Sequence, residues 1–258
     1  MAFLRTGSPP ALDRALTILE AVANSAHGLR LPEVTRRLGL PKSSAHALLV
    51  TLERRGYLQR NEKGQYIMTA RILALANVAL CNMPLREAAY EVLVDLTRRT
   101  DLAAKFAILD RDQAVLIEQV QPPHAPASMT WLGKRLDLHC TALGKVLIAF
   151  QPRLEWSRLI SEHGLPRHNA NTICTAKGLV DELTATCERG YAFDDEEFIL
   201  GMRCVAVPLP EAATRIPAAI GVTGPAVDIQ PGNVPSLGRL LREAAARIAE
   251  RLASQQDT

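Results

Sequence analysis

The stretch from Leu31 to Met68 limits the fold of this chain more than any other part of the sequence. It reads LPEVTRRLGLPKSSAHALLVTLERRGYLQRNEKGQYIM. Pro32 suits the first turn of a helix, Gly39 has the backbone freedom that ends one, and Pro41 starts another after only a few residues. Two short strands then flank Asn61–Gly64, which has the composition of a turn. The stretch predicts helix, tight turn, helix and short hairpin, the order of a winged helix-turn-helix.

The second helix of this motif has an exposed face suited to nucleic acid. Its buried stripe at helical spacing consists of Ala45, Leu48, Leu49 and Leu52. A recognition helix places its N-terminal residues against base edges and phosphates, and small hydroxyl residues permit a close approach. Glu53 and Glu62 are expected to be solvated surface residues. The residues expected to contact DNA are Arg36, Lys42, Ser43, Ser44, His46, Ala47, Thr51, Arg54, Arg60 and Lys63.

Charge is distributed unevenly along the chain. Residues 1–81 contain 11 Lys and Arg against 5 Asp and Glu, and the remaining residues contain 19 against 22. A basic front and a mildly acidic back suggest that only the front meets a polyanion. This favours double-stranded DNA as the partner of the helix-turn-helix.

Length and cysteine usage exclude several other classes of protein. At 258 residues the chain is long enough for two domains. No apolar run reaches the roughly 18 residues of a membrane-spanning helix, and the N-terminus has no signal-peptide pattern. The five cysteines are odd in number and contain no CxxC pair, which argues against a disulfide framework or a zinc finger and fits a reducing cytoplasm. We therefore expect a cytoplasmic protein with no membrane contact, no cofactor and no metal.

Two apolar stripes outside the motif suggest an interface. A first helix carries the stripe Leu12, Ala15, Leu16, Leu19, Val22 and Ala23. A connector helix from Ala70 to about Leu80, with Thr69 as a candidate cap, carries the stripe Ile72, Leu75, Ala76 and Ala79. A helix exposed between two domains should be polar, so the connector needs a partner. That partner is either the first helix or the same helix of a second subunit, since symmetric DNA readers usually work as dimers.

The second half of the chain predicts an antiparallel sheet packed with helices, which makes the fold class α+β. Pro84 begins an amphipathic helix. The predicted strands are Leu102–Leu109, Ala114–Val120, Ala127–Leu132, Arg203–Leu209 and Ile216–Thr223. The predicted helices after the first strands are Thr141–Phe150, Arg153–Ser161, Ala176–Arg189 and Val234–Ala253.

Three blocks of sequence carry a resemblance to a known family. They are LGLPKSSAHALLVTLERRGYL at Leu38–Leu58, LHCTALGKVLIAF at Leu138–Phe150, and RGYAFDDEEFILGMRCVAVPL at Arg189–Leu209 followed by AAIGVTGP at Ala218–Pro225. On these blocks the chain resembles the IclR family of bacterial transcriptional regulators along almost its whole length. The resemblance implies a winged helix-turn-helix over residues 8–69, a linker helix over 70–83 that mediates dimerisation, and a GAF-like effector domain over 84–254.

The resemblance also implies what the chain binds. Family members are dimers or dimers of dimers, and many respond to small organic acids, so we expect a ligand-controlled regulator, more often a repressor than an activator. The residues that correspond to the family's effector contacts are Ala142, Leu143, Asp194, Cys204, Gly221 and Thr223. The chain departs from the family at Ala47, where a basic residue is usual, at Thr69, where a glycine is frequent, and at Gly221, where a hydroxyl residue is frequent. We therefore expect a different base preference and a roomier effector pocket.

Two other functions compete with regulation. A cysteine-dependent enzyme would use Cys140 or Cys204 with His124, His139 or His163, but no G-x-S-x-G or HExxH motif supports it, and no catalytic residue is assigned. A winged helix can also serve as a protein-interaction module. For several residues a structural role competes with a binding one: Cys204 as a small buried hydrophobe, Asp194 as a loop anchor, and Lys145 packing by its stem. His139 and Cys140 are expected to point to opposite faces of a strand.

Overall fold

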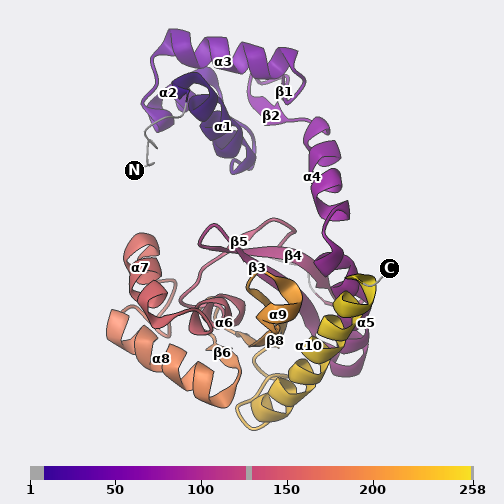
Figure 1. Ribbon diagram of the computed structural model, residues 1–258. Coiled ribbons are helices and arrows are strands. Elements are labelled where there is room, and N and C mark those ends of the chain that lie inside the picture. Colours follow the sequence, from indigo (N-terminus) through magenta and orange to yellow (C-terminus); the bar gives the residue numbers. More distant parts are fainter. Residues whose placement is uncertain (1–8, 126–129, 257–258) are drawn as a thin grey trace. The chain divides into compact units, whose positions relative to one another are not determined.

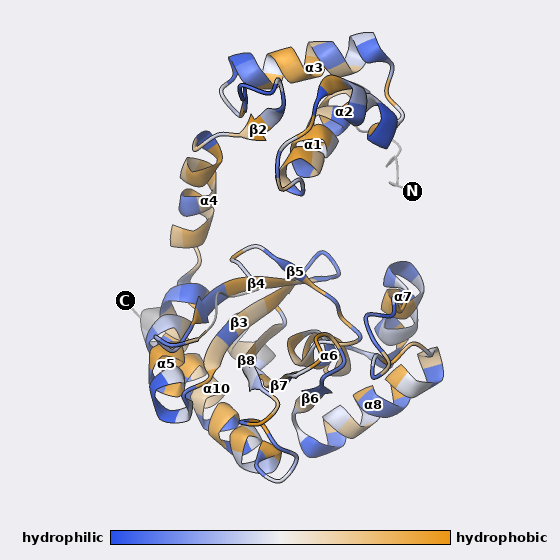
Figure 2. Cartoon of the chain, turned by 180° about the vertical axis from the view of Figure 1, so that it is seen from behind, coloured by the Kyte–Doolittle hydropathy of each residue, from blue (hydrophilic) through white to orange (hydrophobic). Residues whose placement is uncertain are grey.

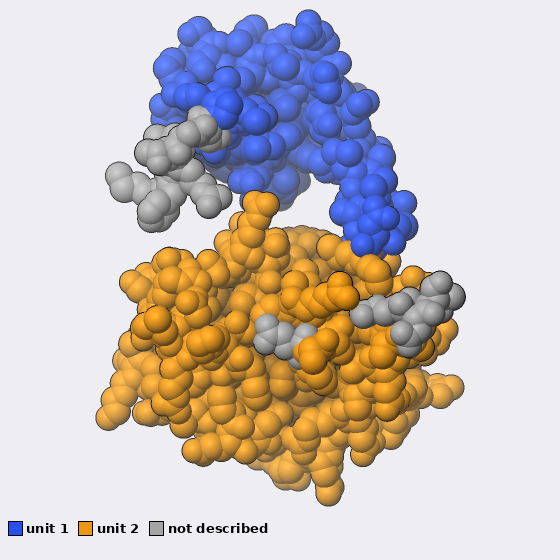
Figure 3. All heavy atoms as spheres, viewed as in Figure 1, with its two compact units in different colours: residues 1–82 blue, residues 83–258 orange. Residues whose placement is uncertain are grey.

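The computed structural model describes residues 9–125 and 130–256. Figure 1 labels the elements along the chain. The chain divides into two compact units, Met1–Asn82 and Met83–Thr258 (Figure 3). No described helix is both long enough and apolar enough to cross a bilayer.

The first unit is the predicted winged helix-turn-helix. It consists of α1 (Pro10–Ala23), α2 (Leu31–Leu38), α3 (Lys42–Arg54) and the antiparallel hairpin β1 (Leu58–Arg60) and β2 (Tyr66–Met68). Gly39 ends α2 in the left-handed region with φ +63°, as the sequence predicted. Pro32 lies in the first turn of α2, and Pro41 directly precedes α3. Proline and glycine therefore set the tight turn between the two helices.

Only the second half of α1 contributes buried residues to the core of the first unit, and they match the predicted stripe only in part. Ile18 and Val22 are buried against α2, α3 and the hairpin. Leu12 and Leu16 are 56% and 50% exposed. The predicted stripe omitted Ile18 and was wrong at its N-terminal end, because the core reaches only the second half of the helix. Two leucines therefore lie on the surface.

Helix α4 (Arg71–Cys81) is apolar and exposed (Figure 2). It contains no buried residue, and Leu73, Leu75 and Val78 are 65%, 53% and 59% exposed. Thr69 accepts a hydrogen bond from the Arg71 N–H and donates one to the Gly56 carbonyl, so it anchors the start of α4 on the end of the winged motif. No described residue fully covers the apolar side chains of α4, so another surface would have to bury them.

The second unit is built on a six-stranded antiparallel sheet. The strands are β3 (Ala103–Asp110), β4 (Gln113–Val120), β5 (Arg135–Leu136), β6 (Ala192–Asp195), β7 (Met202–Pro208) and β8 (Ala218–Pro225). Their order across the sheet is β5-β4-β3-β8-β7-β6. The predicted α+β class is confirmed.

The two edge strands are the ones that the sequence placed wrongly or missed. Of the predicted strand Ala127–Leu132, residues 127–129 lie outside the described residues, and 130–132 are not a strand. The edge strand β5 forms at Arg135–Leu136 instead and pairs with Ala114 and Val115. Strand β6 was not predicted. Both are short, so too few residues alternate to give a recognisable pattern.

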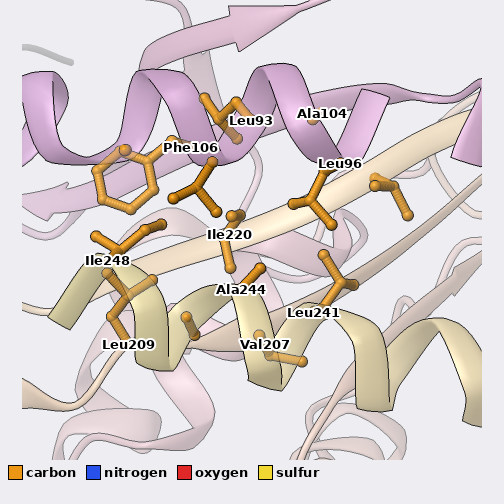
Figure 4. Packing of buried hydrophobic residues seen from close by; sticks show 14 of the residues in the cluster. Leu93, Leu96, Ala104, Phe106, Val207, Leu209, Ile220, Leu241, Ala244 and Ile248 are labelled. Carbon is orange, nitrogen blue, oxygen red and sulfur yellow. The ribbon is translucent and has the colours of Figure 1, made fainter. Parts of the chain in front are cut away.

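Helices cover both faces of this sheet. Helices α5 (Pro84–Thr100) and α10 (Val234–Gln256) pack on one face, where Leu93 and Ile248 meet Phe106 and Ile220 (Figure 4). On the other face lies α6 (Ala142–Ala149), with α7 (Arg153–His163) and α8 (Ala176–Arg189) packed against it. A short helix, α9 (Glu211–Thr214), precedes β8.

Small side chains let α6 lie close to the sheet. The strand residues beneath it include Ala107, Ala192, Ala206 and Ala219. Gly144 of α6 approaches the chain so closely that an added Cβ would lie 2.4 Å from the Asp137 carbonyl oxygen. All eight residues of α6 are buried, including Lys145. The helix that the sequence analysis placed at the effector site is therefore part of the core.

Candidate functional sites

The outward face of α3 presents most of the residues that were predicted to contact DNA. Six of them are exposed and Ser44 is half-buried. No side chain caps the first turn of the helix, so its N–H groups remain available to an anion. The Thr51 hydroxyl donates to the Ala47 carbonyl, 2.8 Å away, so it can offer only its lone pairs to another partner. The exposed residues of this face are Lys42, Ser43, His46, Ala47, Thr51 and Arg54.

The hairpin is held in a defined conformation beside α2. The Arg30 guanidinium donates to the Lys63 carbonyl at 3.1 Å, and the Asn61 side chain accepts from the Lys63 and Gln65 N–H groups. The Lys63 side chain is exposed at the tip. Arg36 is exposed in the last turn of α2. Because these hydrogen bonds fix the backbone of the hairpin tip, the exposed Lys63 ammonium is well placed to contact a phosphate.

Arg60 of the hairpin is less free than the sequence suggested. Its Nη2 lies 3.4 Å from the Glu53 carboxylate, and its guanidinium stacks over the Tyr66 ring at 4.9 Å. Glu53 is half-buried, so its prediction as a merely solvated residue is wrong. The fold uses Arg60 to tie the hairpin to α3, which leaves Lys63 as the more available cation of the hairpin.

A cavity of about 600 Å³ lies in the second unit. Four of the six predicted effector residues line it: Leu143, Asp194, Cys204 and Thr223. Ala142 and Gly221 are not among its lining residues; Ala142 is fully buried. An added Cβ at Gly221 would lie 2.7 Å from the Val205 carbonyl oxygen, so the backbone of the neighbouring strand occupies the space of a side chain there.

Strand register brings these distant residues together. Asp194 of β6 pairs with Cys204 of β7, Cys204 with Thr223 of β8, and Thr223 with Ala103 of β3. Residues paired across strands point to the same face of a sheet. Three successive strands and the distant strand β3 therefore form one row on the floor of the cavity, and Leu143 of α6 adds a wall.

Asp194 both anchors a loop and lines the cavity. Its Oδ1 accepts hydrogen bonds from the N–H groups of Glu197, at 2.8 Å, and Phe198, at 3.4 Å. Burial raises the pKa of Asp194 to about 7, although the Lys145 ammonium opposes that shift. Oδ2 makes no hydrogen bond to the residues that the structure describes. Near neutral pH this carboxyl group can therefore donate or accept a hydrogen bond.

Lys145 has a structural role, as expected, and it also forms ion pairs in addition to packing by its stem. It is fully buried, and its Nζ lies 3.1 Å from a Glu182 oxygen and 2.5 Å from a Glu197 oxygen. It also donates to the Phe193 carbonyl. Arg189 joins the cluster through Glu182 at 2.6 Å. The cluster ties α6 to α8 and to the loop after β6, behind the cavity rather than in it.

The two candidate nucleophiles, Cys140 and Cys204, are buried and have the properties of core residues. Burial raises the pKa of the Cys204 thiol to about 11, and the Thr223 hydroxyl lies 3.0 Å from its sulfur. Burial likewise raises the pKa of Cys140, which is fully buried. A nucleophilic cysteine needs a lowered pKa and access to substrate. Neither thiol meets that requirement.

His139 and Cys140 do not diverge as predicted. Residues 138–140 form a turn rather than a strand, so the alternation of strand side chains does not apply. His139, Cys140 and His168 place one potential ligand atom each within 4.8 Å of one another. His139 Nε2 lies 2.9 Å from the Pro166 carbonyl oxygen, and His168 Nε2 lies 2.8 Å from an Asp137 oxygen. These contacts fasten the 165–170 loop to the turn before α6.

Lys105, which was not among the predicted site residues, also lines the cavity. It lies on β3, and burial lowers its pKa. A signal was available: in LAAKFAIL the lysine is the one charged residue within a predicted apolar strand. A charge at such a position is seldom kept without a partner.

The raised pKa of Asp194 makes a testable prediction about stability. Because the folded state favours the protonated carboxyl, its stabilising contribution is complete below pH 4 and is lost as the pH rises through about 7. Asp194→Asn keeps an uncharged acceptor for the two N–H groups. We expect urea denaturation to show the variant gaining stability relative to the unchanged protein as the pH rises from 4 to 8.

The matched control is Asp228→Asn, which alters an exposed carboxylate of the same cavity. Its stability relative to the unchanged protein should stay nearly constant over this pH range. Parallel pH profiles for Asp194→Asn and the unchanged protein would show that burial does not hold the Asp194 proton.

Comparison with known proteins identifies relatives across both units. A model of the IclR helix-turn-helix domain matches residues 11–62, and a model of the C-terminal domain of the bacterial transcriptional regulator IclR matches residues 77–250. The HTH-type transcriptional regulator XynR of Escherichia coli K12 is 31% identical over 242 residues, which cover 93% of this chain and 96% of XynR. The transcriptional repressor IclR of the same strain is 29% identical over 246 residues, covering 94% of this chain and 90% of the repressor.

Solved structures share the fold. The IclR structure from Thermotoga maritima superposes with a TM-score of 0.71 at 26% identity, covering 94% of this chain and 98% of that one. An IclR homologue from Microbacterium hydrocarbonoxydans, solved in complex with 4-hydroxybenzoate, superposes with a TM-score of 0.77 at 23% identity and covers 95% and 99% of the two chains.

Proposed function

The chain belongs to the IclR family of bacterial transcriptional regulators, and we propose that it binds a specific operator whose affinity is set by a small organic acid in the cavity. Its relatives are DNA-binding regulators and not enzymes, which removes the ground for a cysteine hydrolase. The observation that carries the proposal is the exposed polar face of α3 beside a basic hairpin, in a chain whose second unit holds a cavity.

We propose that α3 enters the major groove and that the hairpin contacts the phosphate backbone. Lys42 and Lys63 supply charge without sequence preference, whereas Ser43 and His46 are placed to meet base edges. Ala47 offers only a methyl group, so direct readout depends on its neighbours. Arg36 and Arg54 are exposed and complete the basic surface.

For the effector, the support comes from the cavity and from one structural neighbour. The Microbacterium hydrocarbonoxydans homologue holds 4-hydroxybenzoate, a small organic acid. The cavity of this chain, at about 600 Å³, lies in the size range of small-molecule sites. Asp194 and Thr223 offer hydrogen bonds to such a ligand, and Leu143 an apolar contact.

We propose that the working form is a homodimer or a dimer of dimers. The exposed leucines of α4 and of the first half of α1 are the surfaces that a second copy would cover. The ligand can change operator affinity only if it prefers one arrangement of the assembly. We propose that the protein represses transcription rather than activating it, as the name of the related repressor IclR indicates for that protein.

The test is a titration of the full chain onto the DNA upstream of its own gene, with a scrambled duplex of equal length as the competitor. We expect tight, sequence-selective binding. The logarithm of the association constant should fall linearly with the logarithm of the salt concentration. Salt-insensitive binding, or equal affinity for both duplexes, would contradict the proposal. Absence of any footprint together with capture of a protein partner would favour an interaction module instead.

A further inference from the structure

Lys105 is a cation of the cavity lining that no described side chain contacts by a hydrogen bond or an ion pair. The residue is half-buried on β3, in contact with the cavity. A partly desolvated cation is costly when no carboxylate contacts it, and here the nearest acid of the cavity, Asp194, attracts Lys105 without forming an ion pair with it. The position of Lys105 therefore favours binding of an anion from outside the chain.

The surroundings of Lys105 leave space for that anion. Lys105 lines the cavity of about 600 Å³, whereas the residues paired with it across the sheet, Gly221, Ala206 and Ala192, lie outside the lining. The neighbouring row holds Thr223, Cys204 and Asp194, all of which line the cavity. A ligand that lies along this neighbouring row meets Lys105 at the β3 end and the hydrogen-bonding groups beyond it.

The other charged groups of the cavity are neutralised or lie at its mouth. Arg203 binds Asp195 at 2.6 Å and also donates to the carbonyls of Ala226 and Ile229. Asp101 and His124, which lie 3.2 Å apart, are both largely exposed. Within the described residues, this leaves Lys105 as the unpaired cation and Asp194 as the buried acid.

We propose that Lys105 is the charge-reading residue of the effector site, and that it selects a ligand with one carboxylate and an apolar body. The inference rests on the proposed function, since it assigns the ligand class of that same cavity. At pH 8, where most of the Asp194 carboxyl is ionised, this residue adds a second filter: a second carboxylate placed beside it would meet like charge and a loss of hydration. Dicarboxylates of the same skeleton should therefore bind more weakly than monocarboxylates.

The experiment uses the full chain and a set of defined probes. The acids are benzoate, 3-phenylpropionate and hexanoate, each compared with its primary amide, and terephthalate and adipate represent the dicarboxylates. Binding is measured at pH 8 by isothermal calorimetry and by the shift in melting temperature. We expect at least one monocarboxylate to bind, with its amide and the matching dicarboxylate at least tenfold weaker.

Variants assign the effect to Lys105. Lys105→Met should weaken binding of the monocarboxylate roughly ten- to hundredfold, the range of a charge-assisted hydrogen bond. Lys105→Arg should retain most of the affinity. The control is Lys177→Met, which removes the same charge from an exposed site on α8 and should bind as the unchanged protein does. Without ligand, Lys105→Met should melt no lower than the unchanged protein, because it removes a desolvated charge.

Three outcomes would overturn the assignment: no monocarboxylate binds, the amides bind as tightly as the acids, or Lys105→Met binds the acid unchanged. Operator binding by the same preparation keeps the two proposals apart. If operator binding persists while no acid binds, the inference is wrong and the DNA-binding proposal stands. If an acid binds through Lys105 but no DNA is bound, the inference stands and the proposed regulation is wrong.

Discussion

Replacing both Lys42 and Lys63 by glutamate should weaken binding to the upstream DNA by roughly a hundredfold at low salt, since each lost phosphate contact costs affinity and each new carboxylate repels the backbone. Both lysines are exposed, one at the start of α3 and one at the tip of the hairpin. The slope of log affinity against log salt should become shallower by about 0.9 for each phosphate contact removed. Electrophoretic mobility shifts at several salt concentrations measure both quantities.

The matched control is Lys177→Glu, which reverses the charge of an exposed lysine on α8 in the second unit. It should leave both the affinity and the salt slope unchanged. Circular dichroism should show that the double variant keeps its helices, because neither lysine contributes to the core of the first unit. An unchanged salt slope in a folded double variant would mean that α3 and the hairpin do not contact the phosphates.

Lys145→Met should destabilise the second unit by about 3–5 kcal/mol, the cost of breaking a buried ion pair by removing one partner. The substitution keeps an apolar stem of similar length but removes the cation that lies 3.1 Å from a Glu182 oxygen and 2.5 Å from a Glu197 oxygen. Glu182 would keep its pair with Arg189, whereas Glu197 would remain buried without a cation. Urea unfolding followed by tryptophan fluorescence reports on this unit, since Trp131 and Trp156 both belong to it.

Lys177→Met serves again as the control for loss of one lysine, with an expected change within about 0.5 kcal/mol for an exposed site. A double variant that combines Lys145→Met with Glu197→Gln should recover part of the lost stability, because it removes the carboxylate left buried without a cation and keeps the Arg189–Glu182 pair. If Lys145→Met unfolds at the same urea concentration as the unchanged protein, the cluster does not hold α6 to α8.

The first unit was predictable because its signals are local. Pro32, Gly39 and Pro41 act through their own backbone conformations, and the hairpin turn acts within four residues. Periodicity identified the buried face of α3 for the same reason. It failed at α1, where Leu12 and Leu16 match the helical spacing and yet are exposed. Spacing shows which residues share a face, but how far the core extends along a helix depends on what packs there.

The cavity was predictable only in part. Family resemblance indicated Leu143, Asp194, Cys204 and Thr223, all of which line it, and also Ala142 and Gly221, which do not. The pairing of β6, β7, β8 and β3 decides which side chains share its floor. That register cannot be read from the strand sequences, because each strand shows only its own alternation, and β3 is separated from β8 by a long stretch of chain.

By itself, the sequence determined the winged helix-turn-helix, the two-part organisation and the family, because those depend on backbone preferences, periodicity and motif order. Only the tertiary structure decided the roles of single charges. It tied Arg60 to Glu53, buried Lys145 among carboxylates, and placed Lys105 in the cavity with no ion pair to any described side chain. The physical reason is that a charge acquires its role from burial and from neighbours within a few ångströms. Those neighbours come from strands and helices that only folding brings together.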